Sequence, residues 1–409
     1  MATFWFISAP LYGHLDWGGY LKTAQALHYR GHKVIWISQP PIQEHIQNQG
    51  IAFEAIQETG WLWPPPPLPE ANSLPPQEAV FIRYRRALDT WLSEDLIPEA
   101  VENLLALAER INPPDIIVTD PFISASAIAA EKIGCKMAVC GWPAQRDLDE
   151  SKLLAVQKEL AQISRQRIQR LCAQFGVKGE NFATGPTPSV QSPHLHISYF
   201  NKRWYQNEPP FLPQTVFVGG SPTPPKGEPP RWQQELPPAP AVLITLGSVF
   251  TGDLGFFAWA AQAVARLGWL PIVVIGRQPF TQTQKEELKR ALPPHTRLLN
   301  WVDYDHLMPH LHLVVHHGGM GTTHAALVHG IPQVVVPHAA DQRAQAKRVS
   351  YAKVGLNLSA HDVRNGQLLP AIRAVGTDEK VRQTAQRFAQ ELANLGGSAR
   401  AAEYLESLL

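Results

Sequence analysis

The sequence has few cysteines, almost no net charge and no long apolar run, and each of these shortages excludes a class of protein. Cys135, Cys140 and Cys172 lack the spacing of metal ligands, so they suit a reducing cytosol and predict no disulfide framework. The 36 basic and 35 acidic residues leave a formal net charge of +1, which gives no pull toward nucleic acid or acidic lipid. No apolar run approaches the ~18 residues that a transmembrane segment needs.

The first residues also lack the features of a signal peptide. MATFWFISAPLYGH has no basic region and no small-residue cleavage site, so we expect a buried first strand there and a cytoplasmic protein. A chain of 409 residues is long for one hydrophobic core, which favours two domains.

Proline, in contrast, is abundant, with 37 of 409 residues against a usual share of ~5%. Eleven prolines fall between Pro209 and Pro240, where neither helical nor strand periodicity is visible. Proline removes backbone donors and stiffens the chain, so we interpret this segment as an extended linker near the middle of the sequence. A second cluster, at 64–76, is too short for a domain boundary and indicates a long loop.

In both halves, short runs of β-branched residues alternate with longer amphipathic stretches. The expected strands are 4–8, 33–38, 51–56, 115–119 and 136–141 in the first half, and 241–247, 270–276, 296–301, 312–317 and 332–337 in the second. Helices are expected between them, including one from about Asp16 to Arg30 and a long one through 77–110. Continuous apolar strands separated by helices indicate parallel sheets covered on both faces.

We therefore predict an α/β protein with two doubly wound, Rossmann-like domains facing a cleft. The first domain would span 1–215, the linker 216–240 and the second domain 241–378. The last helices, 379–409, would extend beyond the second domain, and the sequence leaves open whether they return to the first.

Residues 316–324, HHGGMGTTH, place three glycines between an expected strand and an expected helix. Such a turn lets a ligand approach the main chain, with the amides and the helix dipole favouring an anion such as a pyrophosphate. The motif is neither a P-loop nor G-x-G-x-x-G. A tight turn whose glycines serve only packing is an equally good interpretation of the stretch in isolation.

The surrounding sequence makes the stretch more specific. Trp301 precedes it, and Asp341 and Gln342 follow it in VVVPHAADQ. This order resembles the nucleotide-sugar signature of GT-B glycosyltransferases of the UDP-glycosyltransferase family. That family includes plant UDP-glucosyltransferases and bacterial antibiotic, macrolide, sterol and zeaxanthin glucosyltransferases. The resemblance covers nearly the whole chain and implies the GT-B fold and hexosyl transfer from a nucleoside-diphosphate sugar.

The resemblance also implies roles for individual residues. Trp301 would stack on the base, the Val302 amide would read the base edge, and Asp341 and Gln342 would bind sugar hydroxyls. Ser248 would be a second phosphate contact, although it could also be a helix N-cap. Ala325 stands where plant members have a ribose-binding glutamate, which leaves uridine and thymidine donors open, with uridine preferred. The expected donor-binding residues are Gly247, Ser248, Trp301, Val302, His317, Gly318, Gly319, Gly321, Thr322, Asp341 and Gln342.

His14 and Asp120 are the expected catalytic pair. Both follow expected strands of the first half, and both match the base and its orienting aspartate in the family. Histidine titrates near neutrality, so it can take a proton from an acceptor hydroxyl and give one inverting displacement. A structural histidine and a helix N-cap are the alternative interpretations of these two residues.

The acceptor side is harder to predict. The family often continues Gly-His-x-x-Pro, but here the fifth residue is Trp17, followed by two glycines. Several aromatic residues in expected loops favour an apolar acceptor such as a carotenoid, sterol, hopanoid or polyketide, with peripheral membrane contact, although any single one could belong to the core. The candidate acceptor-binding residues are Trp17, Trp61, Trp63, Arg83 and Trp142.

No metal and no cofactor beyond the nucleotide sugar are expected. Asp303 and Asp305 form a D-x-D pair, but they begin an expected helix, where carboxylates favour the N-terminus. The many histidines between 295 and 338 have no Cys or Glu at metal spacing. The alternatives to a transferase are a nucleotide-sugar epimerase of the same fold and a non-catalytic sugar-nucleotide binding protein.

Overall fold

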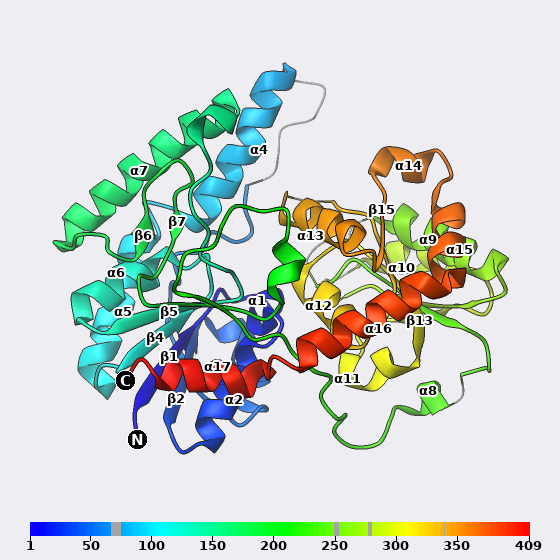
Figure 1. Ribbon diagram of the computed structural model, residues 1–409, viewed down its shortest axis with the longest axis horizontal. Coiled ribbons are helices and arrows are strands. Elements are labelled where there is room, and N and C mark those ends of the chain that lie inside the picture. Colours follow the sequence, from blue (N-terminus) through cyan, green and yellow to red (C-terminus); the bar gives the residue numbers. More distant parts are fainter. Residues whose placement is uncertain (67–74, 235, 249–252, 277–279, 339) are drawn as a thin grey trace. The chain divides into compact units, whose positions relative to one another are not determined.

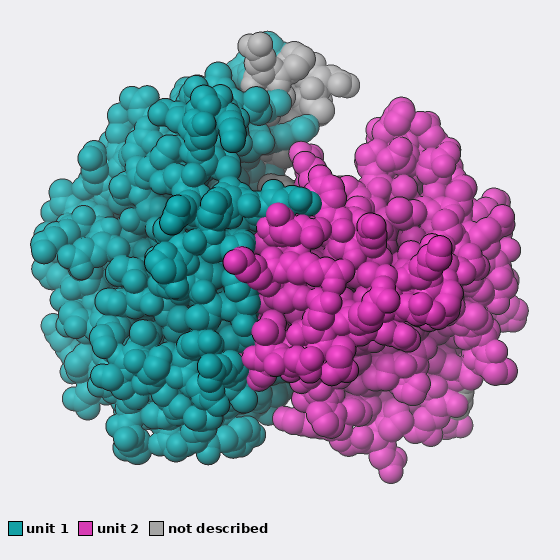
Figure 2. Space-filling view, in the orientation of Figure 1, with its two compact units in different colours: residues 1–198, 207–218, 398–409 teal, residues 199–206, 219–397 magenta. Residues whose placement is uncertain are grey.

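A computed structural model describes residues 1–409 except 67–74, 235, 249–252, 277–279 and 339. The chain divides into two compact units (Figure 2). Unit 1 contains residues 1–198, 207–218 and 398–409, and unit 2 contains residues 199–206 and 219–397. The chain therefore passes from one unit to the other four times, and the proline-rich segment changes unit between Val218 and Gly219.

Unit 1 is built on a seven-stranded, wholly parallel sheet in the order β3-β2-β1-β4-β5-β8-β9 (Figure 1). The strands are β1 Thr3–Ile7, β2 Lys33–Ser38, β3 Ala52–Ala55, β4 Ile116–Thr119, β5 Lys136–Cys140, β8 Leu195–Ser198 and β9 Thr215–Phe217, with a separate hairpin of β6 Phe182–Ala183 and β7 Ser189–Val190. The helices are α1 Gly13–Asp16, α2 Tyr20–Tyr29, α3 Gln43–Gln47, α4 Pro76–Trp91, α5 Ile97–Ile111, α6 Ser124–Ile133, α7 Ala155–Phe175 and, at the C-terminus, α17 Gly397–Glu406.

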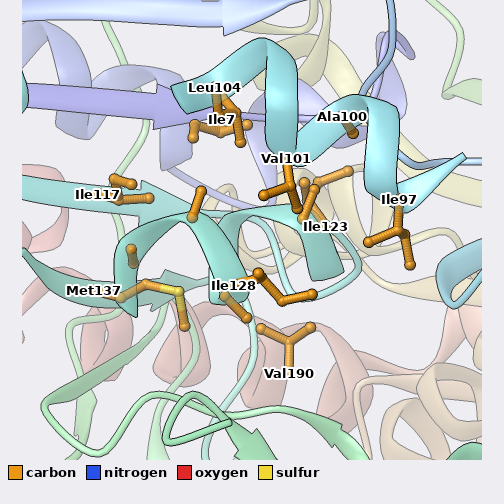
Figure 3. Close-up of a cluster of buried hydrophobic side chains, with 14 of the residues drawn as sticks. Ile7, Ile97, Ala100, Val101, Leu104, Ile117, Ile123, Ile128, Met137 and Val190 are labelled. Carbon is orange, nitrogen blue, oxygen red and sulfur yellow. The ribbon is translucent and has the colours of Figure 1, made fainter. Parts of the chain in front are cut away.

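Alternate residues of these strands face opposite sides, and both sides are buried. Trp5, Ile7 and Ile117 pack against α5 and α6, in the cluster that Figure 3 shows with Val101, Leu104, Ile128 and Met137. Phe6 lies on the other side, where its ring contacts Tyr20 of α2 and Trp36 of β2 at centroid distances of 5.2 and 5.7 Å. Burial on both faces explains why the strands are continuously apolar.

Unit 2 contains a six-stranded parallel sheet in the order β12-β11-β10-β13-β14-β15. The strands are β10 Ala241–Thr245, β11 Leu270–Val274, β12 Arg297–Leu299, β13 Leu311–His316, β14 Gln333–Val335 and β15 Gly355–Asn357. The helices are α8 Arg231–Gln234, α9 Leu254–Arg266, α10 Gln282–Ala291, α11 Tyr304–Leu307, α12 Met320–Val328, α13 Ala340–Tyr351, α14 Ala360–Arg364, α15 Leu368–Thr377 and α16 Glu379–Ala393. Val242 and Ile244 pack with α9 and α15 on one face, and Leu243 packs with Leu307 and Ala326 on the other.

These two doubly wound sheets confirm the predicted fold class. In unit 1 the chain runs from β1 outward to β3 and then returns to place β4 beside β1. In unit 2 it runs from β10 outward to β12 and returns to place β13 beside β10. Ligands of open α/β sheets bind beyond the carboxyl ends of the strands at such a switch point. The fold therefore singles out the loops after β1 and β4 and those after β10 and β13.

The helix boundaries differ from two predictions. The helix predicted from Asp16 to Arg30 is α2, which begins later, at Tyr20, because Trp17 adopts a left-handed φ of 42° and the chain turns through Gly18 after the short helix α1. The helix predicted through 77–110 is two helices, since Leu92 leaves helical geometry and α5 starts anew at Ile97. Part of the predicted loop at 64–76 lies outside the described residues.

The C-terminal helices belong to different units. Helix α16 lies in unit 2, while residues 398–409 of α17 and its end lie in unit 1. Glu406 receives two hydrogen bonds from the Arg30 guanidinium, at 2.9 and 2.7 Å, and lies 2.9 Å from His32 Nε2. These contacts hold α17 beside the turn between α2 and β2. Among the described residues, no helix combines the length and apolar character of a membrane span.

Candidate active site

The switch point of unit 1 brings His14 and Asp120 together. His14 lies in α1, just after β1, and Asp120 follows β4 directly. The imidazole Nδ1 is 3.0 Å from Asp120 Oδ2. The His14 side chain is 13% exposed and the Asp120 side chain is fully buried. The aspartate thus holds one ring nitrogen and leaves Nε2 for another partner.

Asp120 is fixed by the backbone around it. Its Oδ2 also accepts a hydrogen bond from the Ala9 amide at 3.2 Å, and its Oδ1 accepts one from the Phe122 amide at 2.8 Å. Helix α6 is capped at Ile123, so the carboxylate is not its N-cap. An acceptor-only carboxylate matches this ring of donors, and its bond to Nδ1 selects the tautomer that is unprotonated at Nε2.

Aromatic side chains surround the imidazole. The rings of Trp17 and Trp61 each lie edge to face with His14, at centroid distances of 4.9 Å. The Phe122 ring lies 5.9 Å from His14 and also contacts Trp17, Trp61 and Trp142. We call His14, Trp17, Trp61, Phe122 and Trp142 the aromatic cluster. The imidazole of His14 is therefore bordered mainly by apolar ring surfaces.

Trp17 reaches this position through an unusual backbone. A φ of 42° is uncommon for a bulky side chain, and the following Gly18 has a φ of 90°. Gly141, at the end of β5, faces the indole: a Cβ there would lie 2.8 Å from Trp17 Cβ. The chain thus places a tryptophan, only 5% exposed, against His14, at the position where the sequence analysis noted the absence of a proline.

Two polar atoms of the cluster are unsatisfied. Both the Trp17 and the Trp61 indole nitrogens are buried, and neither has a hydrogen-bond partner among the described residues. Of the predicted acceptor-binding residues, the structure places Trp17 and Trp61 against His14, and Trp142 against Phe122. Trp63 and Arg83 are not part of the aromatic cluster, and Arg83 is exposed on α4.

At the switch point of unit 2, glycines make room for His317. A Cβ on Gly247 would lie 2.7 Å from the imidazole Cε1, and a Cβ on Gly319 would lie 2.4 Å from its Nε2. A Cβ on Gly318, whose φ is 90°, would lie 2.9 Å from the Gln342 carbonyl oxygen. Packing therefore requires these three glycines. Only Gly321, where a Cβ would meet nothing within 4 Å, borders open space.

The two adjacent histidines are held neutral. The Gly318 amide donates to His316 Nδ1 at 3.1 Å, so the proton is on Nε2, which lies 2.9 Å from Gln333 Oε1. Burial lowers the pKa of His316 to about 4. Burial, and then the neighbouring His316 and His338, lower the pKa of His317 to about 3, against a hydrogen bond with the Thr245 backbone. Any anion bound here would meet amides and hydroxyls rather than imidazolium charge.

The two threonines of the motif differ in the use of their hydroxyls. Thr323 donates to the Gly319 carbonyl at 2.9 Å, within its own helix. The Thr322 hydroxyl instead lies 3.1 Å from the hydroxyl of Tyr304, in α11. Gly319 is the N-cap of α12, so Thr322 stands in the first turn, where the free amides and the helix dipole favour an anion.

Two further predicted donor-binding residues are Trp301, which follows β12, and Gln342, whose carbonyl lies beside Gly318. Trp301 is 53% exposed, a large exposure for a tryptophan. Val302 beside it is buried. Gln342 is buried and accepts a hydrogen bond from the His338 amide at 2.8 Å, whereas Asp341 is exposed in the first turn of α13.

The structure also shows whether Ser248 and Asp303 are helix N-caps. Helix α9 is capped by Asp253, which accepts from the Phe256 amide at 3.0 Å, so Ser248 is not its N-cap. The Asp253 carboxylate also lies 3.4 Å from His338 Nε2, and that histidine lowers the pKa of the carboxyl. Asp303 is the N-cap of α11, accepting from the Asp305 amide at 2.9 Å. Within the described part of the chain, no cluster of three or more His, Cys, Asp or Glu side chains could hold a metal ion.

Two residues near the site, Phe122 and Tyr304, were not predicted from the sequence. Phe122 follows Asp120 by two residues, and that proximity to a predicted catalytic residue was the available signal. Tyr304 lies inside the quoted stretch around Trp301, but its contact with Thr322 depends on the parallel order of β12, β10 and β13, which one sequence does not reveal.

Comparisons with known proteins bear on the family and the fold of the chain. The family model described as the C-terminal domain of erythromycin biosynthesis protein CIII-like proteins matches residues 273–408. A demethyllactenocin mycarosyltransferase of Streptomyces fradiae is 29% identical over 178 residues, or 44% of this chain and 38% of that protein. This chain thus aligns with less than half the length of that relative.

Two other similarities extend over the whole chain. An NDP-glycosyltransferase of Bacillus subtilis (strain 168) is 24% identical over 410 residues, covering 98% of this chain and 96% of that protein. A solved structure of a spinosyn rhamnosyltransferase complexed with thymidine diphosphate superposes with a TM-score of 0.73 at 19% identity. The alignment covers 99% of this chain and 100% of the rhamnosyltransferase chain.

Proposed function

We propose that this chain, which belongs to the GT-B glycosyltransferases of the UDP-glycosyltransferase family, moves a hexose from a nucleoside-diphosphate sugar to a hydroxyl of a small apolar acceptor. The single observation that carries the proposal is the pairing of the part-buried His14 with the buried Asp120 at a strand switch point, with Nδ1 and Oδ2 3.0 Å apart. A histidine that is held in one orientation by an aspartate can act as a general base and remove the proton of an acceptor hydroxyl.

Unit 2 is the proposed donor-binding half. Trp301 would stack on a pyrimidine base, and the start of α12 with Thr322 would hold the diphosphate. Asp341 and Gln342 would bind sugar hydroxyls, and Ser248 would add a phosphate contact. The spinosyn rhamnosyltransferase structure contains thymidine diphosphate, while the sequence analysis preferred uridine, so both diphosphates belong in every test.

The proposed reaction is one displacement with inversion. The acceptor O–H donates its proton to His14 Nε2 while Asp120 holds Nδ1 and stabilises the imidazolium that forms. The acceptor oxygen attacks the anomeric carbon as the bond to the diphosphate oxygen breaks, and that oxygen takes the bonding electron pair. An α-linked donor sugar therefore gives a β-glycoside.

The aromatic cluster favours a polycyclic or polyketide-like acceptor that carries an oxygen near the reacting hydroxyl. Its rings offer edge and face contacts for a carbon skeleton. The two unsatisfied indole N–H groups would each gain a hydrogen bond if an acceptor oxygen reached them, and a buried donor without a partner costs roughly 1–3 kcal/mol.

A transfer assay tests the proposal. The protein is incubated with UDP-glucose or dTDP-glucose and a panel of macrolides, anthracyclinones, sterols and carotenoids, and products are identified by their added hexose mass and by the coupling constant of the anomeric proton. We expect a β-glycoside with wild-type protein and none with His14→Ala. If folded protein that binds the donor glycosylates no panel member and leaves the donor chemically unchanged, a non-catalytic binding protein becomes the better interpretation. Conversion of the donor sugar to its epimer would indicate the epimerase alternative.

A further inference from the structure

A short chain of two hydroxyl groups in unit 2, those of Tyr304 and Thr322, joins the loop after β12 to the start of α12. The Tyr304 hydroxyl lies 3.1 Å from Thr322 Oγ1, and Thr322 is in the first turn of α12. Two loops, after β12 and β13, are thus linked by side-chain oxygens at the carboxyl edge of the sheet.

The direction of this hydrogen bond follows from the surroundings of Tyr304. Among the described residues, the hydrogen-bond partner of its hydroxyl is Thr322 Oγ1. If Thr322 donated to Tyr304, the phenol proton would be left without an acceptor, which costs roughly 1–3 kcal/mol for a buried group. A phenol is also more acidic than an aliphatic hydroxyl and is therefore the better donor. The favoured order has Tyr304 donating to Thr322.

We propose that Tyr304 is a positioning residue for the donor diphosphate: by donating to Thr322 Oγ1 it leaves the Thr322 proton directed at a phosphate oxygen. Thr323 shows the alternative, because its proton goes to the Gly319 carbonyl, four residues earlier in the same helix. Tyr304 donates its own proton into Thr322 Oγ1 and so commits that hydroxyl to donation. The burial of Tyr304 raises the pKa of its phenol, so the phenol keeps its proton at neutral pH.

The inference rests on the proposed function, since it assumes that a nucleoside diphosphate binds at the start of α12. In this proposal Tyr304 acts on the ligand through Thr322 rather than by direct contact. It also predicts which part of the ligand is affected: only the diphosphate, because Trp301 reads the base independently.

The test is Tyr304→Phe, which keeps the buried ring and removes the hydroxyl. Calorimetry measures the Kd for UDP and dTDP, and NMR titration measures the weaker Kd for uridine and thymidine. We expect diphosphate binding to weaken by about three- to tenfold, the effect of losing one oriented hydrogen bond, with nucleoside binding unchanged. Thr322→Val should give a similar or larger loss, and the double variant should lose little more than Thr322→Val alone.

Tyr205→Phe is the matched control, because Tyr205 is a buried tyrosine of unit 2 that plays no part in the hydroxyl chain. It should leave all four affinities unchanged. Equal diphosphate binding by wild type and Tyr304→Phe would overturn the inference and leave the proposed function standing. An equal loss of nucleoside and diphosphate binding would also overturn it, since that pattern indicates general damage. If wild type binds neither diphosphate, the proposed function itself fails and the inference fails with it.

Discussion

Replacing Asp120 by asparagine exchanges one carboxylate oxygen for an NH2 group in a site whose three neighbours all present N–H groups. Oδ2 accepts from the Ala9 amide and the His14 Nδ1 proton, and Oδ1 accepts from the Phe122 amide. An asparagine can accept hydrogen bonds from at most two of these three N–H groups, because only one of its two terminal side-chain atoms is an oxygen. The substitution therefore has two possible side-chain orientations, and each has a defined cost.

In the first orientation the amide oxygen replaces Oδ2, and the NH2 group opposes the Phe122 N–H. In the second the oxygen keeps the Phe122 bond, while the NH2 group opposes the Ala9 N–H and donates to His14 Nδ1. The Phe122 bond is the shorter of the two, 2.8 Å against 3.2 Å, so we expect the second orientation. His14 then carries its proton on Nε2 and cannot accept one from the acceptor.

The expected loss of kcat/KM is the full contribution of general-base catalysis, about 10²–10⁴-fold. Either orientation buries one unsatisfied amide, which should lower the free energy of unfolding by roughly 1–3 kcal/mol. Rates of nucleoside-diphosphate release are measured with an acceptor identified in the transfer assay, and stability is measured by urea unfolding. Because Asp120 acts through His14, the variant carrying both His14→Ala and Asp120→Asn should be no slower than His14→Ala alone.

Asp115→Asn is the control. Asp115 precedes β4, at the opposite end of that strand from Asp120, and accepts a hydrogen bond from the Thr3 amide at 2.7 Å. We expect its kcat/KM to remain that of wild type. The reasoning is refuted if Asp120→Asn keeps near-normal turnover, or if the double variant loses the product of the two single losses.

Three other predictions concern the surroundings of the proposed donor site. Trp301→Ala should weaken UDP or dTDP binding by about 1–3 kcal/mol without changing the Tm, because the indole is 53% exposed; unchanged calorimetric affinity would remove Trp301 from the site. Gly319→Ala should lower the Tm through its clash with His317, whereas Gly321→Ala, whose Cβ meets nothing, should keep the Tm; equal Tm changes would contradict the packing account. The pKa values of His316 and His317, lowered to about 4 and about 3, mean that their stabilising effect is complete above pH ~6.5 and is lost as the pH falls toward 4. Between these pH values the free energy of unfolding should therefore rise with pH. His316→Gln should reduce this slope, measured by urea unfolding, by about 1.4 kcal/mol per pH unit, and an unchanged slope would show that this histidine titrates normally in the folded protein.

The positions of the central strands and of the loops that follow them could be predicted from the sequence because parallel strands buried on both faces are continuously apolar. Strands β8, β9 and β15 were not predicted, since their residues form short runs without that signature. The start of α2 was predicted too early for a different reason. The left-handed conformation of Trp17 depends on the space that Gly141 leaves, and Gly141 is 124 residues further along the chain.

The candidate site shows the same limit. The pairing of His14 with Asp120 was expected and the structure places them 3.0 Å apart, but their catalytic role stays a prediction. The three glycines of HHGGMGTTH were interpreted as room for a ligand, with packing as the alternative, and the structure gives two of them, Gly318 and Gly319, a packing role beside Gln342 and His317. Tyr304 and Phe122 enter the site only through contacts across loops, which depend on the three-dimensional order of the strands.

The central claim is that unit 2 binds a pyrimidine nucleoside diphosphate through Trp301 and the start of α12. The most direct measurement is a calorimetric titration of the wild-type protein with UDP, dTDP, GDP and ADP, repeated on Trp301→Ala and Thr322→Val. We predict that UDP or dTDP binds more tightly than GDP and ADP, and that both variants weaken this binding. Folded protein that binds none of the four nucleotides, or that binds them equally with and without Trp301 and Thr322, would contradict the account.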